Sequence, residues 1–258
     1  MSPAETGTSS DAAAQSFMRK LPAAAFGIAA LAALGALASG LGHRFGLWGY
    51  GFGFLLLRVA AWTGLAGALA CAAAAVWAVR ARALGALLAS LVGLAAGGAA
   101  FGVPWAMIGQ GRGAPPIHDI TSDTAHPPQF VALAEARRAS PNGLAYGGAA
   151  VAELQHRAYP GIVPLALGAH PEAAFQRCLD AARGLGWRIV SADPAALRIE
   201  ATATTPFFGF KDDIVIRITP LGGASRVDVR SASREGRGDL GTNARRIRAF
   251  YRELARRG

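Results

Sequence analysis

The pattern of hydrophobic and polar positions divides the chain into an apolar N-terminal part and an alternating C-terminal part. Three long apolar runs occupy Leu21 to Leu41, Phe54 to Val79 and Leu84 to Ile108. Each run is long enough to cross a hydrocarbon core of about 30 Å at about 1.5 Å per helical residue. The sequence therefore predicts three transmembrane helices within residues 21–110, after a disordered cytoplasmic tail over residues 1–20.

From residue 166 onward, the pattern predicts a separate domain. A helix with one apolar face is expected to begin near Pro171 and to end at Gly184. Four runs with the period of half-buried strands follow, over Trp187 to Ser191, Leu197 to Thr205, Lys211 to Thr219 and Ser225 to Ser231. A second amphipathic helix follows Asp239. The order αββββα predicts a two-layer α+β domain with an antiparallel four-stranded sheet over residues 166–258.

Residues 111–165 contain many Pro and Gly residues and show little periodicity. Two short helices are possible, around Phe130 to Ala139 and Gly148 to Arg157. A loop of this length usually packs on something. We therefore expect an extended segment that wraps the C-terminal domain.

Composition supports a membrane protein with anionic partners. Hydrophobic residues make up 52% of the chain and charged residues only 16%, and the apolar excess lies in the first 110 positions. The net charge is +10, which favours anionic partners such as lipid headgroups, nucleic acid or acidic polymers. Cys71 and Cys178 form no redox or zinc motif, and a disulfide between them is not expected.

The short loops predict the orientation in the membrane. Four positive residues fall on one side, namely Arg19, Lys20, Arg80 and Arg82, whereas the opposite loop offers Arg44 alone. By the positive-inside rule the N-terminus is cytoplasmic, and the C-terminal domain lies on the far side, which in a bacterial inner membrane is the periplasm. A signal peptide cut after Ala38 would leave that domain on the same side. Nucleic-acid binding would require the opposite topology and is not expected.

The membrane runs are rich in small residues, including the pairs Gly93/Gly97 and Gly98/Gly102. Small residues at this spacing let helices approach closely, so an oligomer formed through these faces is possible. A genome rich in alanine and glycine codons would produce the same pattern.

The second face of the predicted sheet is polar. Its residues are Arg198, Glu200, Thr202, Thr204, Asp213, Arg217, Arg226, Asp228 and Arg230. Opposite charges on neighbouring strands favour a solvated, salt-bridged face over a binding surface. Asp212 and Asp213 are adjacent on a strand and point to opposite sides, which argues against a catalytic pair. Asp212 is expected to be buried against an arginine or a loop amide.

One cluster has metal-ligating residue types, His118, Asp119, Asp123 and His126. Its spacing matches no recognised ligand pattern, and the segment has no predicted secondary structure to hold ligands in place. Neither a metal nor a cofactor is therefore predicted.

The strongest candidate site is the polar connection between the last strand and the last helix. Its residues are Arg230, Ser231, Ser233, Arg234, Arg237, Asp239 and Asn243. Guanidinium groups, hydroxyls and free amides at a helix start together can bind an anion. The alternative is structural: the arginines brace the loop against Asp212, Asp213 and Asp228, while Asp239 caps the helix and Asn243 ties it back.

The same region resembles a known family. The matching words are DVRSASREGRGDLGTNARRIRAF from Asp228, FFGFKDDIVIRI from Phe207, PPIHDITSDTAHPPQF from Pro115 and AYPGIVPL from Ala158. These words, in this order, resemble the domain of unknown function 1499 family over roughly the last 145 residues. The resemblance implies a domain boundary and no chemistry.

Taken together, the residues favour an inner-membrane protein that displays a periplasmic, non-enzymatic binding or structural domain. Its expected partner is an anionic lipid or an envelope glycopolymer. The alternative is a cell-envelope hydrolase or transferase that uses carboxylates near Asp212, Asp213 and Arg230.

Overall fold

The computed structural model describes residues 5–256. These residues form two compact units. The first runs to Gln110 and also includes Phe207–Gly209, and the second contains Gly111–Pro206 and the residues from Phe210 onward. The boundary at 110/111 places the Pro- and Gly-rich segment inside the second unit.

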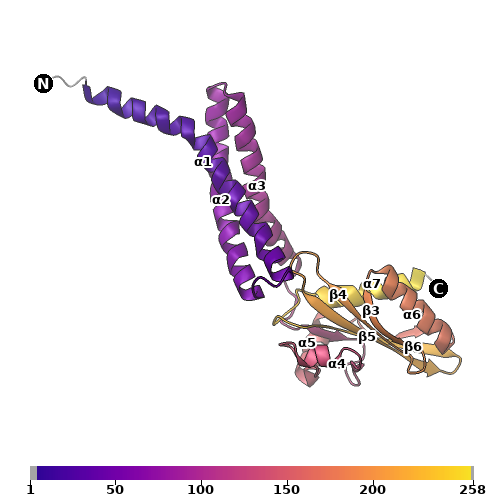
Figure 1. The fold of residues 1–258 in the computed structure, drawn as a ribbon. Helices are drawn as coiled ribbons and strands as arrows, with labels where there is room; N and C mark the ends of the chain where they lie inside the picture. The colour runs from indigo at the N-terminus through magenta and orange to yellow at the C-terminus, as the bar shows by residue number, and fades with distance from the viewer. Residues whose placement is uncertain (1–4, 257–258) are drawn as a thin grey trace. The chain divides into compact units, whose positions relative to one another are not determined.

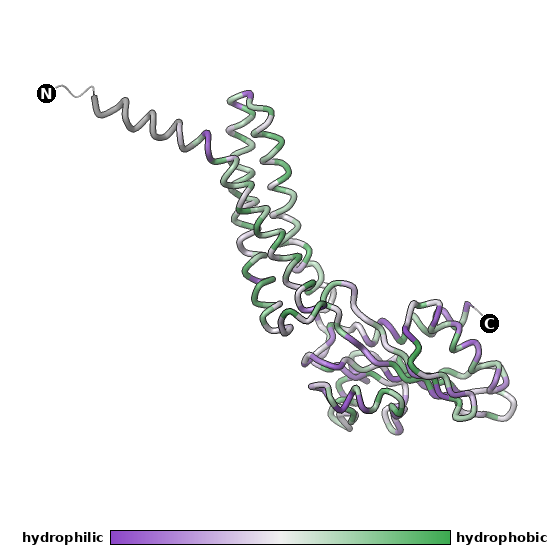
Figure 2. The backbone as a smooth tube through the Cα atoms, in the orientation of Figure 1, coloured by the Kyte–Doolittle hydropathy of each residue, from purple (hydrophilic) through white to green (hydrophobic). Residues whose placement is uncertain are grey.

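The first unit consists of three long helices, α1 (Glu5–Arg44), α2 (Tyr50–Arg80) and α3 (Leu84–Gln110) (Figure 1). All three are long and apolar enough to cross a membrane, over Met18–Arg44, Tyr50–Arg80 and Leu84–Gly109. Figure 2 shows the hydrophobic residues along these helices. The predicted three apolar helices are confirmed.

Glycines allow α2 and α3 to pack closely. A Cβ on Gly97 would lie 2.5 Å from the carbonyl oxygen of Gly64, and a Cβ on Gly93 would lie 2.5 Å from Cys71 Sγ. Any larger side chain at these positions would push the helices apart. A Cβ on Gly98 or Gly102 would have no such neighbour within 4 Å. The Gly93/Gly97 pair therefore serves packing within the chain.

The sequence predicted a disordered tail over residues 1–20, whereas among the described residues α1 already begins at Glu5. Ala12, Ala13 and Ala14 are strong helix formers. Adding residues to a helix that the apolar run has already nucleated is far easier than starting a new one. Residues 1–4 lie outside the described part.

The second unit is built on an antiparallel sheet of six strands rather than four. The strands are β1 (Asp119–Thr121), β2 (Leu165–Leu167), β3 (Arg188–Asp193), β4 (Arg198–Thr204), β5 (Lys211–Leu221) and β6 (Ala224–Ser233). The four predicted runs form β3 to β6, paired in sequence order. Both β1 and β2 pair with the remaining edge of β6. Three residues are too few to show an alternating pattern, so the sequence did not reveal these two strands.

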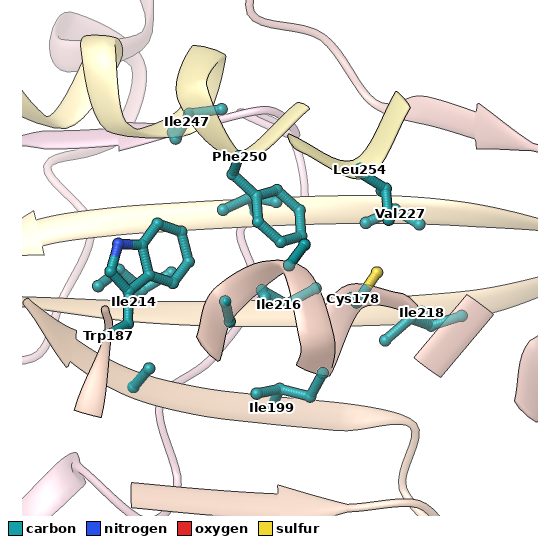
Figure 3. Close-up of a cluster of buried hydrophobic side chains, with 14 of the residues drawn as sticks. Cys178, Trp187, Ile199, Ile214, Ile216, Ile218, Val227, Ile247, Phe250 and Leu254 are labelled. Carbon is teal, nitrogen blue, oxygen red and sulfur yellow. The ribbon is translucent and has the colours of Figure 1, made fainter. Parts of the chain in front are cut away.

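Helices α6 (Pro171–Gly184) and α7 (Thr242–Arg256) cover one face of the sheet (Figure 1). Between them and the strands lies the main hydrophobic core (Figure 3). Ile247, Phe250 and Leu254 of α7 are fully buried and form the apolar face of this amphipathic helix. The ring of Phe250 stacks on Trp187 at a centroid distance of 5.5 Å. The closing helix thus seals the core.

The other face of the sheet is covered by the segment that precedes α6, which includes α4 (Ala134–Arg138) and α5 (Gly148–Ala158) (Figure 1). The expectation of a solvated polar face is therefore wrong. Glu200 and Asp228 are at most 1% exposed. Both Glu200 oxygens accept hydrogen bonds from the amides of residues 131–133, at 2.8 to 3.0 Å. The polar side chains on this face hold the covering segment in place, because its amides find their acceptors there.

Candidate functional site

The loop between β6 and α7 is shaped by Asp239. Its carboxylate accepts hydrogen bonds from the amides of Gly241 (2.8 Å) and Asn243 (2.6 Å), so it caps the helix as the sequence predicted. Burial raises the pKa of Asp239 above its ordinary value, although the two amides act in the opposite direction. Asp239 is therefore committed to the helix start and is not available to a ligand.

Arg230 lies inside the domain. It is 0% exposed and donates two hydrogen bonds to Asp119, from Nε at 3.0 Å and from Nη2 at 2.7 Å. It also donates to the carbonyl oxygens of Pro128 and Leu144. Arg230 thus joins β6 to the covering segment and is not part of an open site.

Arg234 is a brace, as in the structural alternative. Its Nε and Nη2 both donate to the Asp213 carboxylate at 2.9 Å. Asp213 also accepts from Thr202 Oγ1 at 2.9 Å and from Arg137 Nη1 at 3.3 Å. Four donors hold this buried carboxylate, and Arg234 belongs to its structural ion-pair network.

Ser231, Ser233 and Asn243 form a buried hydrogen-bond chain. Ser231 Oγ donates to Asn243 Oδ1 at 2.7 Å, and Asn243 Nδ2 donates to Ser233 Oγ at 3.0 Å and to the His118 carbonyl at 3.1 Å. The chain ties α7 to β6 and to the covering segment. These three predicted site residues are structural as well.

Arg237 is the exception among the predicted site residues, because it is exposed and lines a cleft of about 390 Å³ in the second unit. The cleft is also lined by Pro116, Ile117, His118, Asp119, Asn142, Ala145, Gly147 and Val151. Within residues 5–256, neither the Arg237 guanidinium nor the His118 ring has a hydrogen-bond or ion-pair partner. The cleft therefore offers two groups that are free to meet a ligand.

The charge balance of the cleft favours an anion. Asp119 is its one acidic lining residue, and Arg230 already neutralises it. Asn142 supports the loop by donating from Nδ2 to the carbonyl oxygens of Ser233 (3.1 Å) and Gly236 (3.0 Å). These two hydrogen bonds anchor the backbone next to Arg237. A ligand in the cleft would therefore meet the Arg237 cation, the His118 imidazole and apolar side chains.

A buried hydroxyl lies next to the cleft in sequence. Tyr146 sits between two lining residues, Ala145 and Gly147, and its hydroxyl has no partner among the described residues. Burial and the nearby Asp119 raise the pKa of Tyr146 to about 12, so the hydroxyl keeps its proton at neutral pH. Its guanidinium neighbour Arg230 lies 5.7 Å from the ring centroid. Tyr146 thus offers a donor and no charge.

The paired carboxylates of the enzyme hypothesis are occupied. Asp212 accepts from Arg246 Nη2 of α7 at 2.5 Å, whereas Asp213 is held by Arg234 and Arg137 on the other side of the strand. The expected burial of Asp212 against an arginine is confirmed. Because the two carboxylates point to opposite faces, they cannot act on one substrate.

The metal-like cluster is also dispersed into ion pairs. Asp119 pairs with Arg230, and Asp123 accepts from Arg217 (3.0 Å) and Arg226 (2.7 Å). Among the described residues, no group of three or more His, Cys, Asp or Glu side chains could hold a metal ion. Of this cluster, His118 and Asp119 line the cleft together with Arg237, and Asp119 is already paired with Arg230.

Sequence reasoning missed Asn142 and the role of His118. Both lie in the segment 111–165, whose path over the sheet no local pattern reveals. His118 precedes β1, and the pairing of Asp119 with Ala232 in β6 carries it toward the start of the loop. A recognisable strand after His118 would have indicated that this residue lies beside β6, but β1 has only three residues and shows no alternating pattern.

These features define a class of protein: an α+β domain attached to three apolar helices. The family model described as "Protein of unknown function (DUF1499)" matches residues 119–254, which is more than half of the chain. The chain therefore belongs to the DUF1499 family, as the resemblance implied. No curated protein matches it.

A solved structure shows partial similarity. The crystal structure of the protein TTHA0849 from Thermus thermophilus is 12% identical, with a TM-score of 0.24. The match covers 37% of this chain and 93% of that chain. At this level of similarity no functional argument follows from it.

Proposed function

We propose that this protein is anchored in the bacterial inner membrane and displays a periplasmic, non-enzymatic domain that binds an anionic envelope component. The observation that carries the proposal is the cleft beside the β6–α7 loop. Arg237 and His118 both line it, and neither is used by an internal partner among residues 5–256. A guanidinium that no carboxylate satisfies, next to a rigid loop, suits a phosphate or carboxylate.

The periplasmic placement rests on the distribution of positive charge. Arg80 ends α2 and Arg82 lies in the turn before α3, and together with Arg19 and Lys20 they mark one side of the membrane. Three helices that can cross the membrane carry the chain to the opposite side at Gly111. The cleft would then face the periplasm and its anionic polymers.

The lining suggests what kind of anion fits. Pro116, Ile117 and Val151 supply apolar walls next to the two polar groups. A phosphate carried on a glycerol or sugar unit would place its charge on Arg237 and its carbon atoms on these walls. A charge-assisted hydrogen bond contributes about 1.5–3 kcal/mol. With so few contacts we expect dissociation constants between micromolar and millimolar.

The enzyme alternative has less support. A general acid or base must be able to exchange a proton with a substrate. Asp212 and Asp213 are buried in ion pairs, and Arg230 is fully enclosed. A hydrolase or transferase would need another catalytic group, and the cleft offers His118 without a carboxylate free to orient it.

Calorimetric titration of the full-length protein in a neutral detergent tests the proposal. Inorganic phosphate, a glycerol phosphate polymer and short-chain phosphatidylglycerol serve as three probes. We expect binding that weakens with salt, and Arg237→Gln should weaken it about tenfold, equivalent to about 1.4 kcal/mol. Arg138→Gln, which removes one exposed arginine of α4, should have no effect.

The probes also distinguish the source of the phosphate. Tighter binding of the polymer than of the lipid favours a glycopolymer, and the reverse order favours a lipid headgroup. The proposal fails if none of the three probes binds, or if Arg138→Gln weakens binding as much as Arg237→Gln.

A further inference from the structure

The outward side of α7 carries a row of arginines. Arg245, Arg248 and Arg252 are exposed and lie three and four residues apart, so they share one side of the helix. The only acidic residue of α7 is Glu253, which pairs with Arg256 at 2.8 Å. The row therefore has no acidic partner within its own helix.

The hydrogen-bond and ring contacts of Arg245 and Arg248 are with neutral groups. Arg245 donates to the Leu240 carbonyl (2.8 Å) and to Thr242 Oγ1 (3.0 Å). The guanidinium of Arg248 lies 5.5 Å from the centroid of the Tyr159 ring. Such contacts orient the side chains but leave their charges uncompensated. The row thus presents a fixed positive surface.

Leu240 adds an apolar group at the start of this helix. It is 47% exposed and has a φ of +52°, a conformation that is uncommon for a leucine. The Asp239 cap and the hydrogen bond from Arg245 to the Leu240 carbonyl hold this turn. The turn therefore presents a large apolar side chain to the solvent beside the arginine row.

Chain connectivity keeps this turn near the end of α3. Gly111 directly follows α3, and a Cβ on Gly111 would lie only 2.5 Å from Leu240 Cβ. Consecutive Cα atoms lie about 3.8 Å apart, so Gly111 stays close to the last residues of the helix whatever the orientation of the domain. If α3 crosses a membrane, Leu240 must lie near its surface.

We infer that Leu240 and the row Arg245, Arg248 and Arg252 contact the headgroups of an anionic bilayer on the side where α3 ends. An apolar side chain beside several arginines is the combination that binds interfaces, since one enters the acyl boundary while the others meet lipid phosphates. This surface is separate from the cleft and does not depend on a ligand there.

Depth-dependent quenching of the full-length protein in bilayers tests this inference. Leu240→Cys is labelled with a thiol-reactive fluorophore, which avoids Cys71 and Cys178 because both are fully buried. Nitroxide-labelled lipids should quench the label more in phosphatidylglycerol than in phosphatidylcholine, and salt at about 0.5 M should reduce the difference. The control, Leu221→Cys at the end of β5, is 56% exposed and should respond equally in both lipids.

Charge reversal then tests the arginines. Arg248→Glu with Arg252→Glu should lower the ratio of docked to undocked label by on the order of tenfold or more. Arg138→Glu with Arg188→Glu makes the same charge change at exposed positions of α4 and β3 and should leave the ratio unchanged. Equal quenching of the Leu240 label in the two lipids, or equal effects of the two double variants, would overturn the inference.

Discussion

Arg230 and Asp119 form a buried bidentate ion pair between β6 and β1, with hydrogen bonds of 3.0 and 2.7 Å. The guanidinium also lies 4.9 Å from the centroid of the Phe130 ring. This pair fixes the covering segment on the polar face of the sheet.

Removal of one partner of this pair should be costly. Asp119→Ala leaves the Arg230 charge buried without a counterion, which we expect to cost about 3–5 kcal/mol. The double variant Arg230→Met with Asp119→Leu removes both charges and should lose clearly less stability than Asp119→Ala. Hydrogen exchange of the β5 and β6 amides in the full-length protein reports the opening free energy. An equal loss in the single and double variants would mean that the charge pair is not the cause.

The closing helix provides the second prediction. Ile247→Ala should cost about 2–5 kcal/mol, because the 0% exposed side chain leaves a cavity against the sheet. Leu221→Ala removes an aliphatic side chain that is 56% exposed, and should change the opening free energy by less than about 0.5 kcal/mol. The same exchange measurement applies. Near-native protection in Ile247→Ala would contradict the role of α7 in the core.

The third prediction concerns acid stability. Burial acts to raise the pKa of Asp123, but the His126 amide, Arg226 and Arg217 outweigh it and hold this pKa below its ordinary value. Since the folded state favours the ionised carboxylate, the stabilisation is present at neutral pH and is lost as pH falls through the folded pKa.

Asp123→Asn should therefore destabilise the domain at pH 7, whereas the two proteins should converge in stability at a pH below 3.8, the ordinary value for this carboxyl group. Exchange rates compared between pH 7 and strongly acidic conditions, corrected for intrinsic rates, check this. A stability difference that stays constant over the whole range would show that the Asp123 charge is irrelevant.

The topology gives the fourth prediction. A reporter enzyme that is active only in the periplasm should be active when fused after Gly258, because the positive residues favour a cytoplasmic N-terminus. A reporter that is active only in the cytoplasm should be silent at the same position. The opposite result would reverse the proposed orientation.

The sequence predicted the elements with long periodic patterns and missed those without them. The amphipathic pattern after Asp239 identified α7, and alternation located the four longer strands. The same alternation suggested a solvated polar face, since Glu200 and Asp228 would each be exposed on an uncovered strand. Their burial depends on the segment from 111 to 165, whose position is set by distant side-chain pairs such as Arg230 with Asp119.

The candidate site was predicted only in part, because contacts between residues far apart in the sequence decide which loop residues are available to a ligand. Local sequence identifies Arg234 and Arg237 as equivalent polar loop residues, three positions apart. Their difference arises from tertiary contacts, because Asp213 of β5 lies within 2.9 Å of Arg234 whereas Arg237 lines the cleft. No pattern along the chain distinguishes a brace from a ligand contact.

The most direct test of the account compares these two arginines in the full-length protein. Titration with the glycerol phosphate polymer is combined with hydrogen exchange of β5 and β6. Arg237→Ala should lose most of the binding and keep wild-type protection from exchange. Arg234→Ala should lose protection from exchange, because Asp213 loses two hydrogen-bond donors, but should keep its affinity per folded molecule. Loss of binding in Arg234→Ala with full protection, or unchanged binding in Arg237→Ala, would contradict the account.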